Sequence, residues 1–164
     1  MDARRLTHTV LEAAHRALGA PDPQPLRKAP PMSGYALSHV DLSVSDLDHA
    51  EKWYARLLDA TCVLDGTNEE YGFAYRYLKT PAGTLLGLIR HDDRDPAPFS
   101  PRRTGLDHLS FAVDSPEELR AQLSKLTDLG IPNSGIIEQP TGDAIAFRDP
   151  DGIQLEFYRL TVQP

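Results

Sequence analysis

The feature of this sequence that most constrains its fold is an internal repeat. When the second half of the chain is shifted back by 69 residues, one ungapped register aligns a strand, a helix, a turn and a second strand. A single register that fits four successive elements indicates a duplicated module rather than chance pairing of common residue types. The aligned pairs are His39 with His108, Val44 with Val113, Leu57 with Leu126, Pro81 with Pro150, Gly83 with Gly152, and Leu86 with Leu155.

Hydrophobic periodicity predicts the same βαβββ order in both copies. In the first copy we expect strands at 37–44, 61–64, 73–78 and 84–89, with a helix from a cap at Ser45 or Asp46 to residue 58. In the second copy we expect strands at 106–113, 136–137, 144–147 and 153–158, with a helix at 116–129. The predicted fold class is therefore α+β, with two modules (35–91 and 105–160, joined by a linker at 92–104) that pair into a cleft or half-barrel within a domain at 34–164.

The first 33 residues differ from the rest of the chain. Apolar residues at helical spacing predict a short amphipathic helix that ends near Gly19, and a proline-rich tether follows it. The apolar side of this helix packs against the main body or a partner chain, or else the segment is a frayed tail. The helical positions are Leu6, Val10, Ala14 and Leu18.

Charge and cysteine content narrow the classes of partner. The chain has 17 Lys and Arg against 24 Asp and Glu, a formal net charge of −7, so we expect neither nucleic acid nor an anionic membrane as partner. Its single cysteine, Cys62, excludes an internal disulfide and a cysteine-rich zinc site. No apolar run approaches the roughly 20 residues that span a bilayer. We therefore expect a cytoplasmic protein that acts on a small molecule.

Two histidines and one glutamate form the candidate metal site. If the modules face each other, the aligned pair His39 and His108 meets across the cleft. Glu156 alternates with Leu155 and Phe157, so its carboxylate lies on the opposite face of the strand from them. An ionised carboxylate on an inner face is costly unless it is paired or binds a cation. Either histidine alone is more simply structural, but the combination predicts a divalent metal held by His39, His108 and Glu156.

The repeat also identifies a position without a fourth ligand. Gly87 aligns with Glu156, so the first module has no side chain at the equivalent place. Three protein ligands with open positions are typical of a catalytic metal. Two histidines and a carboxylate also form the facial triad of non-heme Fe(II) oxygenases, which makes Fe(II) the favoured ion. Mn, Ni, Co or Zn could occupy the same ligands.

Two further residues are candidates for catalysis. Asp41 shares the face of His39 and could transfer a proton or bond a ligand histidine. Tyr158 shares the face of Glu156 and could place its phenol over the substrate. The alternatives are a satisfied polar residue at the cleft mouth for Asp41, and a core tyrosine with its hydroxyl at solvent for Tyr158.

Three segments carry a resemblance to a known family: 37–47 (LSHVDLSVSDL), 105–113 (GLDHLSFAV) and 147–157 (FRDPDGIQLEF). There the chain resembles the vicinal oxygen chelate superfamily, also called the glyoxalase, bleomycin-resistance and extradiol-dioxygenase family, over residues 35–160. The resemblance implies paired βαβββ modules, a homodimer, and a metal in the cleft bound at the positions of His39, His108 and Glu156. Glyoxalase-like members usually have a fourth ligand where this chain has Gly87.

That departure argues against lactoylglutathione lyase activity. It makes extradiol-type dioxygenation of a substrate chelated through two neighbouring oxygens the sharpest prediction. A lyase or isomerase of the glyoxalase type is one alternative. A non-catalytic protein that binds a small molecule or an antibiotic is the other.

Overall fold

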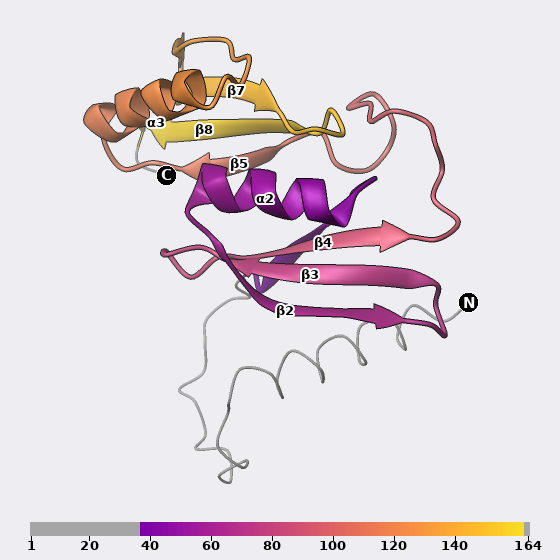
Figure 1. Ribbon diagram of the computed structural model, residues 1–164. Helices are drawn as coiled ribbons and strands as arrows, with labels where there is room; N and C mark the ends of the chain where they lie inside the picture. Colours follow the sequence, from indigo (N-terminus) through magenta and orange to yellow (C-terminus); the bar gives the residue numbers. More distant parts are fainter. Residues whose placement is uncertain (1–36, 163–164) are drawn as a thin grey trace, which may run out of the picture. The chain divides into compact units, whose positions relative to one another are not determined.

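The computed structural model describes residues 37–162 as two compact units that divide between Arg94 and Asp95. Each unit has one four-stranded sheet and one α-helix (Figure 1). The predicted α+β class with two βαβββ modules is confirmed. The predicted N-terminal helix and tether, residues 1–33, lie outside the described residues.

The two units have the same topology. In the first, the sheet order is β1-β4-β3-β2, and in the second it is β5-β8-β7-β6. In each sheet the first and last strands pair in parallel and the other neighbours are antiparallel. The first unit contains β1 (His39–Ser43), α2 (Leu47–Leu58), β2 (Thr61–Asn68), β3 (Phe73–Lys79) and β4 (Leu85–His91). The second contains β5 (Leu109–Ala112), α3 (Pro116–Asp128), β6 (Ile137–Gln139), β7 (Gly142–Arg148) and β8 (Gln154–Leu160).

Both helices begin at side-chain caps, and the sequence predicts the first of them at Ser45 or Asp46. Asp46 Oδ1 accepts from the His49 backbone N–H at 3.0 Å, and Ser115 Oγ accepts from the Glu118 N–H at 3.1 Å. Each helix buries an apolar stripe against its sheet. The buried residues are Leu47, Ala50, Tyr54 and Leu57 in α2, and Leu119 and Leu126 in α3.

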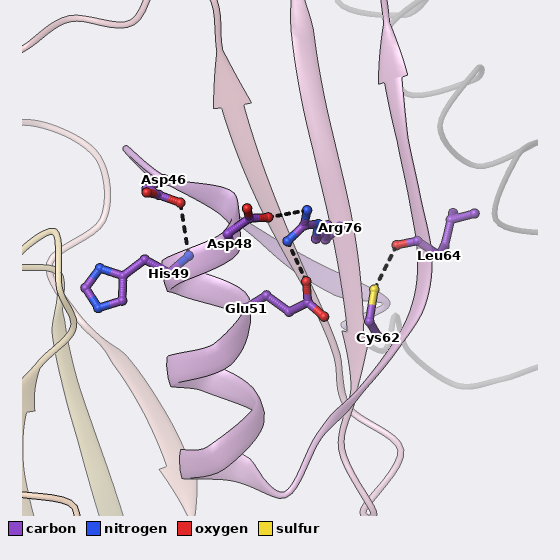
Figure 2. A network of polar contacts seen from close by, with 7 residues as sticks. All are labelled: Asp46, Asp48, His49, Glu51, Cys62, Leu64 and Arg76. Carbon is purple, nitrogen blue, oxygen red and sulfur yellow. Dashed lines mark hydrogen bonds and ion pairs between the residues drawn. The ribbon is translucent and has the colours of Figure 1, made fainter.

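Arg76 shows which face of the first sheet the helix covers. Its guanidinium donates from β3 to Asp48 and Glu51 of α2, at 2.6 and 2.5 Å (Figure 2). Because successive residues on a strand point to opposite faces, Tyr77 lies on the face away from α2. His39 and Asp41 share this face with Tyr77, since Asp41 Oδ2 lies within 3.3 Å of the Tyr77 hydroxyl.

Matching turns precede the last strand of each module and set its register. In the first module the Thr84 N–H donates to Thr80 Oγ1 at 3.1 Å, and in the second the Ile153 N–H donates to Asp149 Oδ1 at 2.7 Å. Gly152 has a positive φ of 81°, a conformation that favours glycine. This turn delivers Glu156 opposite Ser110 across the β5–β8 ladder.

Among residues 37–162, no helix is long and apolar enough to cross a membrane.

Candidate metal centre

His39 in the first unit lies beside a carboxylate. His39 is the first residue of β1, and its Nε2 lies 3.8 Å from Asp41 Oδ2. Its other ring nitrogen, Nδ1, lies 3.2 Å from the hydroxyl oxygen of Ser38. The two side chains of the first pair are partly accessible, with 24% of His39 and 36% of Asp41 exposed.

His108 in the second unit has the same arrangement. Its Nε2 lies 3.4 Å from Glu156 Oε1, and its Nδ1 lies 2.6 Å from Asp107 Oδ1. His108 directly precedes β5, whereas the sequence analysis placed it inside that strand. The Glu156 side chain is only 17% exposed, and its neighbours Leu155 and Phe157, on the opposite face of β8, are buried in the core.

In both modules the residue before the histidine contacts Nδ1, while Nε2 faces the carboxylate. A contact that fixes a proton on Nδ1 leaves the Nε2 lone pair available to a metal. Sequence reasoning missed Ser38 and Asp107. The repeat could have found them, because position 107 aligns with position 38 and both residues can bond an imidazole.

The donor atoms of the second pair fit a divalent metal, and those of the first pair lie somewhat farther apart. Two ligands bound at about 2.1 Å with an angle of 90–109° lie roughly 3.0–3.4 Å apart. The separation between His108 Nε2 and Glu156 Oε1 is 3.4 Å, within this range, and that between His39 Nε2 and Asp41 Oδ2 is 3.8 Å. Imidazole and carboxylate together suit Mn, Fe, Co, Ni or Zn.

Each pair belongs to one of the two units. Across residues 37–162, no group of three or more His, Cys, Asp or Glu side chains is placed to hold one ion. The structure brings His108 to Glu156 and His39 to Asp41. A single metal centre that includes all three predicted ligands, His39, His108 and Glu156, is therefore a proposal.

The histidine of the second unit is more basic than an ordinary imidazole. The hydrogen bond that the Asp107 carboxylate accepts from the imidazole raises the pKa of His108 above its usual value of about 6.5, and the Glu156 carboxylate adds to this shift. A metal binds only the neutral imidazole, so protons compete with the metal up to a higher pH than they would for an unperturbed histidine.

We therefore predict that Mn(II) affinity falls as pH drops through the raised pKa of His108, and that Asp107→Asn moves this loss to lower pH. Isothermal titration calorimetry from pH 6 to 8 measures the affinity of both proteins. Coincident pH profiles for Asp107→Asn and the wild type would contradict the prediction.

Asp41 is held by a buried tyrosine. Tyr77 is 2% exposed, and its hydroxyl donates to Asp41 Oδ2 at 3.3 Å. Burial, and then the Asp41 carboxylate, raises the pKa of Tyr77 well above its ordinary value, so this hydroxyl keeps its proton. Burial also raises the pKa of Asp41, opposed by His39 and by the Tyr77 hydrogen bond. No pattern in the sequence pointed to Tyr77.

Tyr158 lines a pocket in the second unit. The pocket has a volume of about 270 Å³ and includes Ser110 in its wall. The Tyr158 hydroxyl lies 2.7 Å from Thr141 Oγ1, and the ring packs over Gly142, where a Cβ would lie 2.7 Å from the phenol oxygen. These two contacts hold the phenol in place beside the pocket.

Cys62 lies apart from these donors. Its thiol donates to the Leu64 carbonyl at 3.5 Å, near the α2 side of the sheet (Figure 2). Burial raises the pKa of Cys62, which disfavours the thiolate that binds metals.

The comparisons with known proteins identify the family. Residues 36–157 match the sequence model of the Glyoxalase/Bleomycin resistance protein/Dioxygenase superfamily, and the chain belongs to this superfamily. A glyoxylase/bleomycin resistance protein/dioxygenase domain from Frankia sp. EAN1pec is 34% identical, with a TM-score of 0.72, over 78% of this chain and 99% of that one.

Two other comparisons involve proteins named for particular activities. The metallothiol transferase FosB of Shouchella clausii (strain KSM-K16) is 27% identical over 129 residues, covering 77% of this chain and 81% of FosB. A FosX fosfomycin resistance variant from Listeria monocytogenes, crystallised with Mn(II) and 1S,2S-dihydroxypropylphosphonic acid, is 20% identical with a TM-score of 0.58. That comparison covers 77% of this chain and 92% of FosX, and it shows a shared fold.

Proposed function

We propose that this protein is a divalent-metal-dependent enzyme whose ion is held by His39, His108 and Glu156. The observation that carries the proposal is the pairing of His108 Nε2 with Glu156 Oε1 at 3.4 Å, with Nδ1 held by Asp107 at 2.6 Å. Asp107 fixes the imidazole so that Nε2 faces the ion. When bound, the ion supplies Lewis-acid activation of a substrate that offers two neighbouring oxygens.

The proposal requires that ligands from the two units bind one ion. His39 comes from the first unit, and His108 and Glu156 come from the second. The modules could pair within one chain or between two chains of a homodimer. In either case we propose that equivalent positions of the duplicated module face each other.

The other polar groups act around this ion. Asp41, held by Tyr77, lies next to His39 and acts on the same centre. Tyr158 presents its ring to the pocket wall that includes Ser110, on the face of Glu156, and positions the substrate there.

Two reactions are the leading candidates, and a lyase or isomerase reaction of the glyoxalase type is a further alternative. Extradiol ring cleavage by Fe(II) follows from the three-ligand arrangement that the sequence predicts. The similarity to a protein named as a metallothiol transferase, at 27% identity, favours instead the metal-assisted transfer of a thiol.

Oxygen consumption separates these two reactions. Protein reconstituted anaerobically with Fe(II) is expected to consume oxygen with a catechol only if ring cleavage is the reaction. Protein reconstituted with Mn(II) is expected to consume a thiol with an epoxide substrate if transfer is the reaction. If neither oxygen nor the thiol is consumed across a broad set of catechols and epoxides, both the ring-cleavage and the transfer reaction are contradicted.

A binding protein would behave differently. Its ligand would bind equally well before and after removal of the metal by a chelator, and Glu156→Ala would leave that binding unchanged. The proposed enzyme loses substrate binding in both cases, because the substrate completes the coordination of the ion.

A further inference from the structure

The two modules have different residues at three aligned positions that lie side by side on neighbouring strands. In the second module the row across β5, β8 and β7 is Ser110, Glu156 and Ala146, with the carboxylate between two small residues. In the first module the aligned row across β1, β4 and β3 is Asp41, Gly87 and Tyr77. The first module thus has its carboxylate one strand away, next to a glycine.

The structure shows what fills the space above Gly87. A Cβ at position 87 would overlap Asp41 Oδ1 and lie 2.9 Å from Asp41 Cγ. It would also lie 3.0 Å from Cε1 of Tyr77. The Asp41 carboxylate therefore lies over Gly87, in the volume that a side chain on β4 would occupy. Only glycine at position 87 allows this approach.

Contacts on both sides hold the carboxylate there. Tyr77 donates to Asp41 Oδ2 across Gly87 at 3.3 Å, and His39 Nε2 lies 3.8 Å from the same oxygen. In the second module His108 Nε2 lies 3.4 Å from Glu156 Oε1. Each module therefore pairs the Nε2 of its histidine with one carboxylate, supplied by β1 in the first and by β8 in the second.

We propose that Asp41 is a fourth protein ligand of the metal, reaching it from β1 over Gly87 in place of the missing side chain on β4. This inference rests on the proposed metal centre. The centre then has two histidines and two carboxylates, one of each from either module.

A fourth ligand has a consequence for the reaction. If the bound ion were six-coordinate, four protein ligands and a substrate chelated through two oxygens would fill every position and leave none for dioxygen. Asp41 as a ligand therefore favours the transfer reaction over extradiol ring cleavage.

Calorimetric titration with MnCl₂ tests the inference without an activity assay. We expect Asp41→Asn to lower Mn(II) affinity by about 100-fold, at or above the upper limit for residues that only support a ligand. Gly87→Ala is expected to lower it by about 10-fold or more, because the added Cβ displaces the carboxylate. Asp65→Asn, an exposed position on β2 of the same sheet, is the matched control and is expected to leave the affinity unchanged.

The double variant tests whether Gly87→Ala acts through the Asp41 carboxylate. If Gly87→Ala acts through the Asp41 carboxylate, it adds nothing in the Asp41→Asn background, and the two losses are strongly non-additive. Additive losses, or an Asp41→Asn protein with wild-type affinity, would overturn the inference. Should Gly87→Ala fail to fold, Asp41→Asn alone still decides, because asparagine keeps the size of the side chain.

Glu156→Gln in the same titration distinguishes a failure of the proposed metal centre from a failure of Asp41 as its ligand. If Glu156→Gln lowers the affinity and Asp41→Asn does not, Asp41 is not a ligand and the metal centre stands. If Glu156→Gln has no effect, both the centre and the role of Asp41 are wrong.

Discussion

Replacing Glu156 by glutamine is expected to lower the Mn(II) affinity of the protein by at least about 100-fold, more than the loss of a residue that supports a ligand. The carboxylate is 17% exposed and lies 3.4 Å from His108 Nε2. Glutamine keeps the shape of the side chain but removes the negative charge that a divalent ion needs, and its amide is a weak ligand for these metals. Equilibrium titration with MnCl₂ measures the change.

Glu138→Gln is the matched control for this variant. Glu138 is exposed on the edge strand β6 of the same sheet, so its loss is expected to leave the affinity unchanged. Equal affinity of the Glu156→Gln and Glu138→Gln proteins would mean that Glu156 does not bind the metal.

Replacing Asp149 by alanine is expected to lower the free energy of unfolding by roughly 2–4 kcal/mol, since leaving a buried donor unsatisfied costs about 1–3 kcal/mol. Asp149 is 6% exposed. Its Oδ1 accepts from the backbone N–H groups of Ile153 at 2.7 Å and Asp151 at 3.0 Å. Urea denaturation followed by circular dichroism measures the loss.

Two variants serve as controls for the loss of the Asp149 hydrogen bonds in the turn before β8. Asp149→Asn keeps an oxygen acceptor at Oδ1, so we expect it to retain more than half of the stability that alanine loses. Thr80→Ala removes the single equivalent bond in the first module, at an exposed site, and is expected to cost about 1 kcal/mol or less. An Asp149→Ala protein as stable as Thr80→Ala would show that the carboxylate does not hold the turn.

The repeat made most of the fold predictable, but strand ends depended on pairing. The sequence predicted a strand at 61–64, and β2 extends to Asn68 because its register with β3 continues to Phe73 despite poor strand formers such as Asp65 and Gly66. The strand predicted at 106–113 is reduced to Leu109–Ala112. The exposed edge strand β6 has no buried alternation that a sequence pattern could report.

The site was predictable where it depended on alternation along one strand. Alternation placed Asp41 on the face of His39 and Glu156 opposite Leu155. It could not show that the Asp41 carboxylate lies over Gly87, because that approach depends on the β1–β4 register and on the Tyr77 hydroxyl. The contact of Asp107 with His108 was also missed, since neighbours on an ideal strand point to opposite faces and His108 precedes the strand.

The most direct test of a shared metal centre is elemental analysis of the untagged protein, purified without chelators. The account predicts about one divalent ion per chain in the wild type, or full uptake of one ion on reconstitution with Mn(II) or Fe(II). It also predicts loss of that ion in the His39→Ala and the Glu156→Gln proteins. A wild-type protein that neither contains nor takes up a divalent ion would contradict it.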